Sequence, residues 1–464
     1  MKKNIILLIV SFAMFMEAVD TTIINTAIPA MAHSLKIDPI NLKLALISYL
    51  VSLAIFIPIS GWIADKFGAK KVFIAAIFLF TISSIWCGST HTLFELIVAR
   101  FIQGLGGSLT LPVGRLIIVR ICERHELITK MSIVVMVAAL GMMLGPVLGG
   151  IITSHFSWRW IFWVNIPVGM LTIVMALYLL PDMPSHSVHR LDKSGFILFG
   201  SGLAALTFGL SSLSESDTQN SIAFLIILIA TFLLIAYIWH ARRIRYPIVK
   251  VELFRSRTFF ISVIGNLFSR LGFGGIPFLL PMLLQIALGY SPQLSGLLLA
   301  PTALGVLLVK PLSLSFLRFF GYKKLLLFNT FLVGLSLFSF SQINAHTSVY
   351  NIAWLTFIYG FLIALQYTAM NSLAYANMTH ENLSAATSIM STIQQLAQSF
   401  GVAIAALLLR FFSSSTTGNN VMTTTLFHQT FLAMAIITLF SMIIFINLKK
   451  EDGHELIDRP TVSM

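Results

Sequence analysis

The chain has 464 residues, of which 57% are hydrophobic and only 10% are charged, and its formal net charge is +13 at pH 7. Soluble globular domains carry about 25% charged residues, so this composition excludes an ordinary soluble domain and predicts a polytopic helical membrane protein. The basic excess does not indicate a nucleic-acid partner, because Lys and Arg gather in every second loop between apolar runs. That alternation predicts cytoplasmic loops that face anionic lipid headgroups.

Fourteen apolar runs are each long enough to cross a bilayer as a helix of about 20 residues. Their approximate centres are Glu17, Leu53, Ala76, Gly106, Ala139, Val168, Gly202, Ile229, Ser269, Gly305, Leu332, Gly360, Ala397 and Ala435. An even number of spans places both termini on the cytoplasmic side of a bacterial cytoplasmic (inner) membrane. The predicted fold class is therefore all-α and polytopic.

The first run contains FMEAVDTTII at 15–24, in which Glu17 and Asp20 lie three residues apart on one helix face. A charge near the centre of a membrane helix costs about +2.5 to +3.5 kcal/mol on insertion scales, so such residues usually face the bundle interior. Two close carboxylates in a low-dielectric environment suit the binding and release of a proton. The alternative is that a neighbouring base or hydrogen bond simply neutralises each carboxylate.

An internal repeat organises the rest of the chain. DKFGAKKVF at 65–73 and RFFGYKKLL at 318–326 share the pattern FG-x-KK, so that Gly321 lies 253 residues after Gly68. The same offset aligns Pro39 with Pro292, and it predicts two parallel six-helix bundles with a substrate site between them at the midplane. The predicted segments are a bundle at 1–185, two additional spans with their linkers at 186–256, a second bundle at 257–450, and a short polar cytoplasmic tail at 451–464.

The offset also gives Glu17 a candidate partner, because Arg270 occupies the equivalent position in the second bundle. Equivalent helices flank the central axis, so we predict that this acid and this base can form an ion pair that breaks during a transport cycle. Arg100, Arg115 and Lys310 are the other deep bases, and each either lines the cavity or extends towards the headgroups.

Six motifs carry a family resemblance. GWIADKFGAKK at 61–71 resembles the loop motif of the major facilitator superfamily, although Ala69 stands where a basic residue is usual. The resemblance implies a cytoplasmic gating loop in which Asp65 helps to lock the gate. Its residues are Gly61, Asp65, Lys66, Gly68 and Lys70.

RFIQGLGGS at 100–108 resembles the fourth-helix motif of the same superfamily, and GMMLGPVLGG at 141–150 resembles the signature of its antiporter branch. The matching residues of the second motif are Gly141, Gly145, Pro146, Gly149 and Gly150. Small residues at this spacing allow close helix packing around a hinge that proline weakens.

DTTIINTAIP at 20–29, SWRWIFWVNIPVG at 157–169 and RLDKSGF at 190–196 resemble the fourteen-span drug:proton antiporters, most of all the MdtD-like multidrug-resistance exporters. The resemblance implies that Asp20, with Arg100, couples transport to protons. Glu17 departs from the motif, which usually has an uncharged polar residue there, so Glu17 is either a second titrating group or a partner in a salt bridge.

Polar residues at membrane depth are candidates for the substrate cavity, although interhelical hydrogen bonds explain most such residues without any ligand. The candidates are Asn25, Gln103, Asn266, Arg270, Lys310, Tyr359, Gln366 and Asn371. If two of the four deep bases line the cavity, it favours anionic or zwitterionic cargo.

The sequence therefore predicts a secondary exporter of small amphipathic molecules or drugs, driven by the proton motive force and acting by alternating access. It predicts no enzymatic activity, no cofactor and no metal site, because it lacks both a phosphate-binding GKS or GKT loop and metal-ligand spacing. The expected partners are a small-molecule substrate, protons and membrane lipids, with a monomeric protein. The alternatives are export of an endogenous anionic metabolite such as a siderophore or metal–carboxylate chelate, import by symport, and a non-transporting membrane sensor.

Overall fold

The computed structural model describes residues 2–185, 188–213, 220–379, 382–414 and 422–457, and these parts of the chain form an all-helical membrane protein. Thirteen of the described helical segments are long and apolar enough to cross a membrane. One of them, the helix α12 (Pro292–Phe340), is 49 residues long and contains two spans. The predicted fold class is confirmed, and the number of spans agrees with the predicted fourteen.

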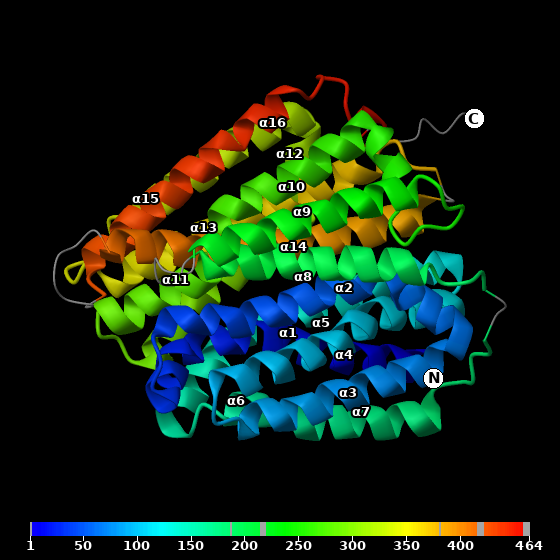
Figure 1. The fold of residues 1–464 in the computed structure, drawn as a ribbon, viewed down its shortest axis with the longest axis horizontal. Coiled ribbons are helices and arrows are strands. Elements are labelled where there is room, and N and C mark those ends of the chain that lie inside the picture. The colour runs from blue at the N-terminus through cyan, green and yellow to red at the C-terminus, as the bar shows by residue number, and fades with distance from the viewer. Residues whose placement is uncertain (1, 186–187, 214–219, 380–381, 415–421, 458–464) are drawn as a thin grey trace.

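The first half of the molecule consists of six spans connected by short loops, and these helices lie together in Figure 1. Their bounds are α1 (Lys2–Leu35), α2 (Lys43–Phe67), α3 (Ala69–Ser89), α4 (Leu93–Ile121), α5 (Arg124–His155), and α6 (Trp160–Trp163) continued by α7 (Asn165–Leu179). A short 3-10 helix, η1 (Pro39–Leu42), precedes α2 and is capped by the side chain of Asp38.

The second half repeats this plan. It consists of η3 (Val251–Arg255), α10 (Arg257–Phe273), α11 (Ile276–Met282), the π-helical turn η4 (Leu283–Ala287), α12, α13 (Val349–Tyr375), α14 (Leu383–Ser414), α15 (Thr424–Phe440) and α16 (Met442–Ile446). A final turn, α17 (His454–Ile457), belongs to the predicted polar tail, of which 458–464 lie outside the described residues.

The repeat is visible in the backbone at its two equivalent glycines. Gly68 has φ 90° and separates α2 from α3, while Gly321 has φ 68° and separates the two spans of α12. Positive φ costs glycine little, whereas other residues avoid it. The FG-x-KK pattern therefore marks the same sharp turn between two spans in each half.

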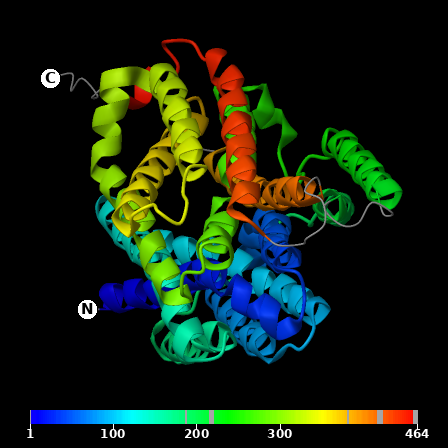
Figure 2. The ribbon, with the colours of Figure 1, turned by 90° about the vertical axis from the view of Figure 1, so that its left-hand side faces the viewer.

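The two additional helices lie at one side of the molecule (Figure 2). They are α8 (Lys193–Ser212) and α9 (Asn220–Ala241), and α8 packs against α2 of the first half and α14 of the second. α9 packs on α8, and only 17% of the most apolar stretch of α9 is buried inside the protein. Such a helix is suited to a lipid environment.

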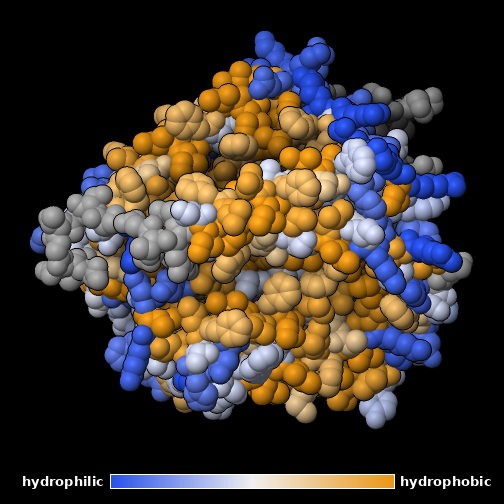
Figure 3. All heavy atoms as spheres, viewed as in Figure 1, coloured by the Kyte–Doolittle hydropathy of each residue, from blue (hydrophilic) through white to orange (hydrophobic). Residues whose placement is uncertain are grey.

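An apolar belt covers the middle of the molecule, and hydrophilic residues concentrate at its two ends (Figure 3). The chain begins at the end of the bundle where α2 is joined to α3 (Figure 1), a junction that Lys66, Lys70 and Lys71 flank in the sequence. We call this the basic end and the other the distal end.

The two halves touch closely at the distal end. A Cβ atom on Gly150 of α5 would lie 2.4 Å from the carbonyl oxygen of Pro292, and one on Gly296 of α12 would lie 2.2 Å from that of Pro146. Only glycine permits this approach of two backbones. Gln285 also donates to the carbonyl oxygen of Thr26 across the halves at 2.9 Å, so the distal end is closed in this conformation.

Candidate transport site

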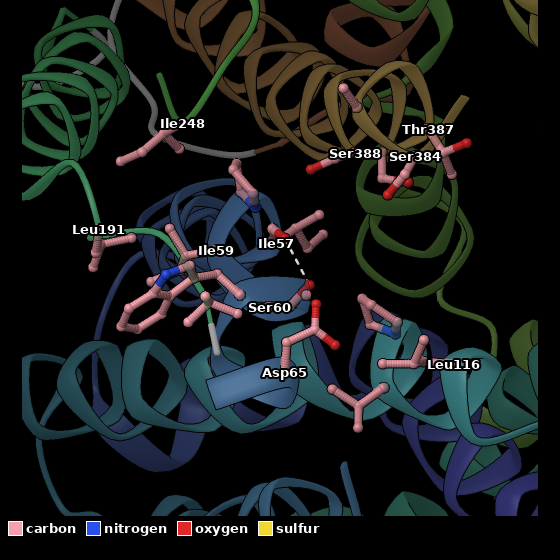
Figure 4. Close-up of a pocket in the computed structure, with 18 of the residues that line it drawn as sticks. Ile57, Ile59, Ser60, Asp65, Leu116, Leu191, Ile248, Ser384, Thr387 and Ser388 are labelled. Carbon is pink, nitrogen blue, oxygen red and sulfur yellow. Dashed lines mark hydrogen bonds between the residues drawn. The ribbon is translucent and has the colours of Figure 1, made fainter. Parts of the chain in front are cut away.

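A cavity of about 720 Å³ lies towards the basic end, within the size range of small-molecule pockets. Figure 4 shows Ser60, Asp65 and Leu116 on one side of it and Ser384, Thr387 and Ser388 of α14 on the other. The cavity therefore lies between the halves. Its remaining walls come from the linkers at 188–192 and 246–250, which flank the additional helices.

The predicted gating loop surrounds one edge of this cavity. Asp65 lines the cavity and accepts a hydrogen bond from Arg120 of α4 at 2.6 Å. Lys70 pairs with Asp182 at 3.1 Å, and the ammonium of Lys66 lies 4.6 Å from the centre of the Trp62 ring. In this conformation the loop is thus held to its own half, and its role in locking the gate remains a prediction.

Asp20 lies at the centre of a polar network inside the first half. Its side chain has no exposed surface, and its Oδ2 accepts from Nη1 of Arg100 at 2.7 Å. Its Oδ1 accepts from Gln103 at 2.9 Å and from Asn165 at 2.8 Å. Four helices of one bundle, α1, α3, α4 and α7, meet here, because Ser84 of α3 also accepts from Gln103 at 2.8 Å.

Arg100 is fixed from two sides. Its guanidinium carbon lies 4.2 Å from the centre of the Tyr49 ring, and Nη1 also donates to Oε1 of Gln103 at 2.7 Å. The side chain is only 1% exposed, so it does not extend to the outer headgroups. Additional hydrogen bonds stabilise a buried ion pair, and this network supplies them to the carboxylate, whereas Nε of Arg100 has no hydrogen-bond partner among the described residues.

Glu17 has a different environment from Asp20. The residue is half-buried, and its Oε2 is a buried atom without a hydrogen-bond partner among the described residues. The hydroxyl of Tyr49 lies with Glu17 beside Gly107 of α4. The two carboxylates therefore differ, since both oxygens of Asp20 accept hydrogen bonds whereas Oε2 of Glu17 accepts none from the described residues.

Arg270 forms a second polar cluster in the other half. Its Nε donates to Asn266 at 2.8 Å, its Nη1 donates to Gln398 at 3.2 Å, and its guanidinium carbon lies 3.8 Å from the centre of the Tyr367 ring. Asn266 in turn donates to Asn371 at 3.2 Å. Arg270 does not form the predicted ion pair with Glu17 in this conformation, because its side chain contacts residues of its own half.

The other predicted cavity residues lie outside the lining of the described cavity. Gln366 bonds to Asn329 and Thr330 within the second half, and the hydroxyl of Tyr359 donates to the carbonyl oxygen of Phe273 at 3.0 Å. Asn25 is 9% exposed, and the exposed Lys310 donates to the carbonyl oxygen of Val135 at 3.4 Å. Arg115 is the deep base that does line the cavity.

The antiporter motif packs α5 between α1 and α12. Cβ atoms on Gly141, Gly145 and Gly149 would lie within 3.0 Å of Phe15, Thr22 and Ile23 of α1, respectively. Pro146 and Gly150 face α12 at the distal end. The motif therefore connects the helix that carries Asp20 to the contact between the halves.

Sequence reasoning missed three members of the Asp20 network, namely Ser84, Asn165 and Tyr49. Asn165 lies within the SWRWIFWVNIPVG stretch, and a buried amide at the start of a span was a usable signal. Ser84 and Tyr49 gave no signal, because a serine or tyrosine in an apolar run is common and only the packing of helices brings them here.

Replacing Asn165 with alanine is expected to lower the free energy of unfolding by about 1.5–3 kcal/mol, because it removes a buried hydrogen bond to a charged carboxylate. The measurement is denaturant unfolding of the detergent-purified protein. The matched control is Asn447→Ala, whose amide bonds only to the carbonyl oxygen of Ile443 at an exposed site. Equal effects of the two changes would show that the Asp20 network adds nothing to stability.

Comparison with known proteins identifies the family. The model of the Major Facilitator Superfamily matches residues 10–246 and 262–461. The chain is 35% identical over 452 residues to the MdtD protein of Enterobacter sp. (strain 638), which is named for multidrug resistance. The aligned region covers 97% of this chain and 95% of that protein. It is 36% identical over 448 residues to the MdtD protein of Escherichia coli O139:H28, covering 96% and 95%.

Solved transporters share the fold at low sequence identity. A D-xylose-proton symporter has a TM-score of 0.67 at 14% identity, and the match covers 97% of this chain and 99% of the symporter. The POT family transporter PepTSo has a TM-score of 0.70 at 14% identity, and that match covers 98% of this chain and 99% of PepTSo. With the family model and the curated relatives, these matches define the class of protein. The chain belongs to the Major Facilitator Superfamily, as a multi-pass membrane transport protein and not an enzyme.

Proposed function

We propose that this transporter is a proton-coupled exporter of small amphipathic molecules or drugs across the bacterial inner membrane. The observation that carries the proposal is Asp20, a fully buried carboxylate ion-paired within one half of an alternating-access fold. Buried ionisable residues in membrane helices mark proton and ion pathways. The similarity to MdtD proteins, which are named for multidrug resistance, supports drugs as the cargo.

The basic end is assigned to the cytoplasm, because short basic loops face that side of the membrane. The cavity then opens inward, and the distal contact between α5 and α12 closes the outer side. Asp20 is paired with Arg100 in this state, which fits the step that follows release of a proton to the cytoplasm. The conformation is therefore the one that receives cargo from inside.

Protonation of Asp20 would break its ion pair with Arg100. An unpaired buried charge costs several kcal/mol, so Arg100 must find a new partner and the packing of α1 against α4 must change. α1 also carries Thr22 and Ile23, which contact Gly145 and Gly149 of α5. A shift of α1 is thereby passed to α5 and on to its contact with α12, which is a physical route from the proton site to the outer gate.

Inside-out vesicles test this proposal. We expect a pH gradient that is acidic inside the vesicles to drive uptake of a cargo compound. A protonophore should abolish this uptake. Labelled cationic dyes and organic anions are compared in parallel, since the cargo class is open. Uptake that is independent of the gradient would exclude proton coupling, and uptake driven by an opposite gradient would indicate symport.

Export of an endogenous anionic metabolite, such as a siderophore or a metal–carboxylate chelate, is the second candidate. It is favoured by Arg270, whose partners among the described residues are neutral amides and an aromatic ring rather than a carboxylate. An anionic cargo would supply the missing counter-charge. Arg270→Gln is then expected to reduce anion transport selectively, whereas an equal loss for cationic dyes would count against this candidate.

A further inference from the structure

One wall of the cavity comes from neither six-helix half. Residues 188–192 precede α8 and residues 246–250 follow α9, and side chains from both segments line the cavity. Figure 4 shows Leu191 and Ile248 of these segments at the same side of the cavity. We call this the linker wall, and its presence means that the two additional helices contribute directly to the site.

The linker wall is held in place by hydrogen bonds. Trp62 of α2 donates from Nε1 to the carbonyl oxygen of His189 at 2.9 Å. Asp192 caps α8 through the amide of Gly195 at 2.8 Å, and Nε2 of His240 on α9 lies 2.8 Å from the same Oδ1. Ordering of a surface before binding reduces the entropy that a ligand must overcome, so a wall fixed in this way is suited to recognition.

The wall presents aromatic surface to the cavity. The rings of His189 and Tyr246 stack at 4.4 Å with an interplanar angle of 22°, and the Trp62 side chain lines the cavity beside them. Tyr246 remains 46% exposed, so its ring is only partly covered by this packing. A planar ring of a ligand can stack on such surface, a contact that gains energy beyond the apolar area buried.

The two cations that line the cavity, Arg115 and Lys250, are not ion-paired with an acid of the cavity lining among the described residues. Asp65 is paired with Arg120, and Asp192 is engaged with His240 and the start of α8. Lys250 also lines the cavity, and it donates to the neutral amide oxygen of Asn382 at 3.2 Å. Arg115 lines the cavity from α4, and its electrostatic partner Glu17 lies outside the cavity lining. Two cations beside an aromatic wall match a ligand that is both planar and negatively charged.

We propose that the linker wall is a subsite at the cavity mouth that binds planar aromatic anions and selects them as cargo. The proposal rests on the proposed export function for its purpose, but binding to this subsite does not require proton coupling. It gives the two additional helices a task that the six-helix halves do not perform.

The test measures binding of fluorescein, a planar aromatic dianion, to the detergent-purified full-length protein by fluorescence anisotropy. Tyr246→Leu is expected to weaken binding about two- to tenfold, because it removes the stacking surface. Tyr246→Phe keeps the ring and is expected to bind as the wild type does. Lys250→Gln is expected to weaken fluorescein binding but not binding of rhodamine 6G, a planar cation.

The matched control is Trp239→Leu, which removes an exposed aromatic ring of α9 that lies outside the cavity lining. It should leave fluorescein binding unchanged. Glutarate, a dianion without a ring, should compete only weakly with fluorescein. Absence of saturable fluorescein binding to the wild type, wild-type affinity in Tyr246→Leu, or strong competition by glutarate would each overturn the subsite.

The binding assay and the vesicle assay separate the two proposals. Weaker fluorescein binding in Tyr246→Leu together with no gradient-driven uptake would preserve the subsite and remove the exporter proposal. Gradient-driven uptake together with unaltered fluorescein binding in Tyr246→Leu would preserve the exporter proposal and remove the subsite.

Discussion

Asp20→Asn is expected to abolish accumulation of cargo against its gradient. One pH unit corresponds to 1.36 kcal/mol per proton, so an exchanger that moves one proton per cargo molecule can accumulate cargo about tenfold. An asparagine cannot carry the proton, and the accumulation ratio should therefore fall to about 1. The measurement is the steady-state ratio of labelled cargo inside and outside inside-out vesicles at an imposed gradient of about one pH unit.

Asp452→Asn is the matched control for this result. It also removes the carboxylate partner of an arginine, Arg257, but it does so beyond the last span of the second half. Accumulation should remain at the wild-type level. Glu17→Gln is measured separately, because Glu17 lacks the bonds that fix Asp20 and a loss there would identify a second titrating group. Full accumulation in Asp20→Asn would contradict the assignment of the proton site.

Gly296→Val is expected to open the distal end of the protein. The carbonyl oxygen of Pro146 lies 2.2 Å from the point where its Cβ would stand, so α5 and α12 must separate. Overpacking of this kind costs about 1–3 kcal/mol, which shifts a two-state population about 5- to 150-fold. Gly150→Val should act in the same direction, since it crowds Pro292.

The shift is measured with spin labels on cysteines that replace Ser154 and Gln293. These exposed residues meet where α5 contacts α12, and the backbone amide of Gln293 donates to the hydroxyl of Ser154 at 3.1 Å. Gly296→Val should increase the population of long distances. Gly61→Ala serves as the comparison, because nothing lies within 4 Å of its added Cβ in this conformation. An unchanged distance distribution in Gly296→Val would show that this contact does not close the outer gate.

The fold was largely predictable because the bilayer limits what an apolar run can do. With no water to satisfy backbone groups, each run must form a helix, and the basic loops order the runs across the membrane. The turns at Gly68 and Gly321 followed from one repeated pattern. The break between α10 and α11 in the ninth span was not predictable, since it lies where Gly274 and Gly275 pack closely against α14.

The candidate site was predictable only in part, because sequence patterns place residues on helices but do not aim their side chains. Arg100 and Gln103 lie three residues apart on α4 and so could be expected to share a face. That this face meets Asp20 depends on how α1 crosses α4. Arg270 illustrates the limit, since pseudo-symmetry places it opposite Glu17 while its rotamer directs it to Asn266 and Gln398.

Movement of protons caused by cargo tests the central claim most directly. Inside-out vesicles are acidified and their pH gradient is followed with a fluorescent probe while cargo is added. We predict that cargo partly dissipates the gradient in vesicles with the wild-type protein and leaves it intact in vesicles with Asp20→Asn. Cargo transport by the wild type without any change in the gradient would contradict proton-coupled export.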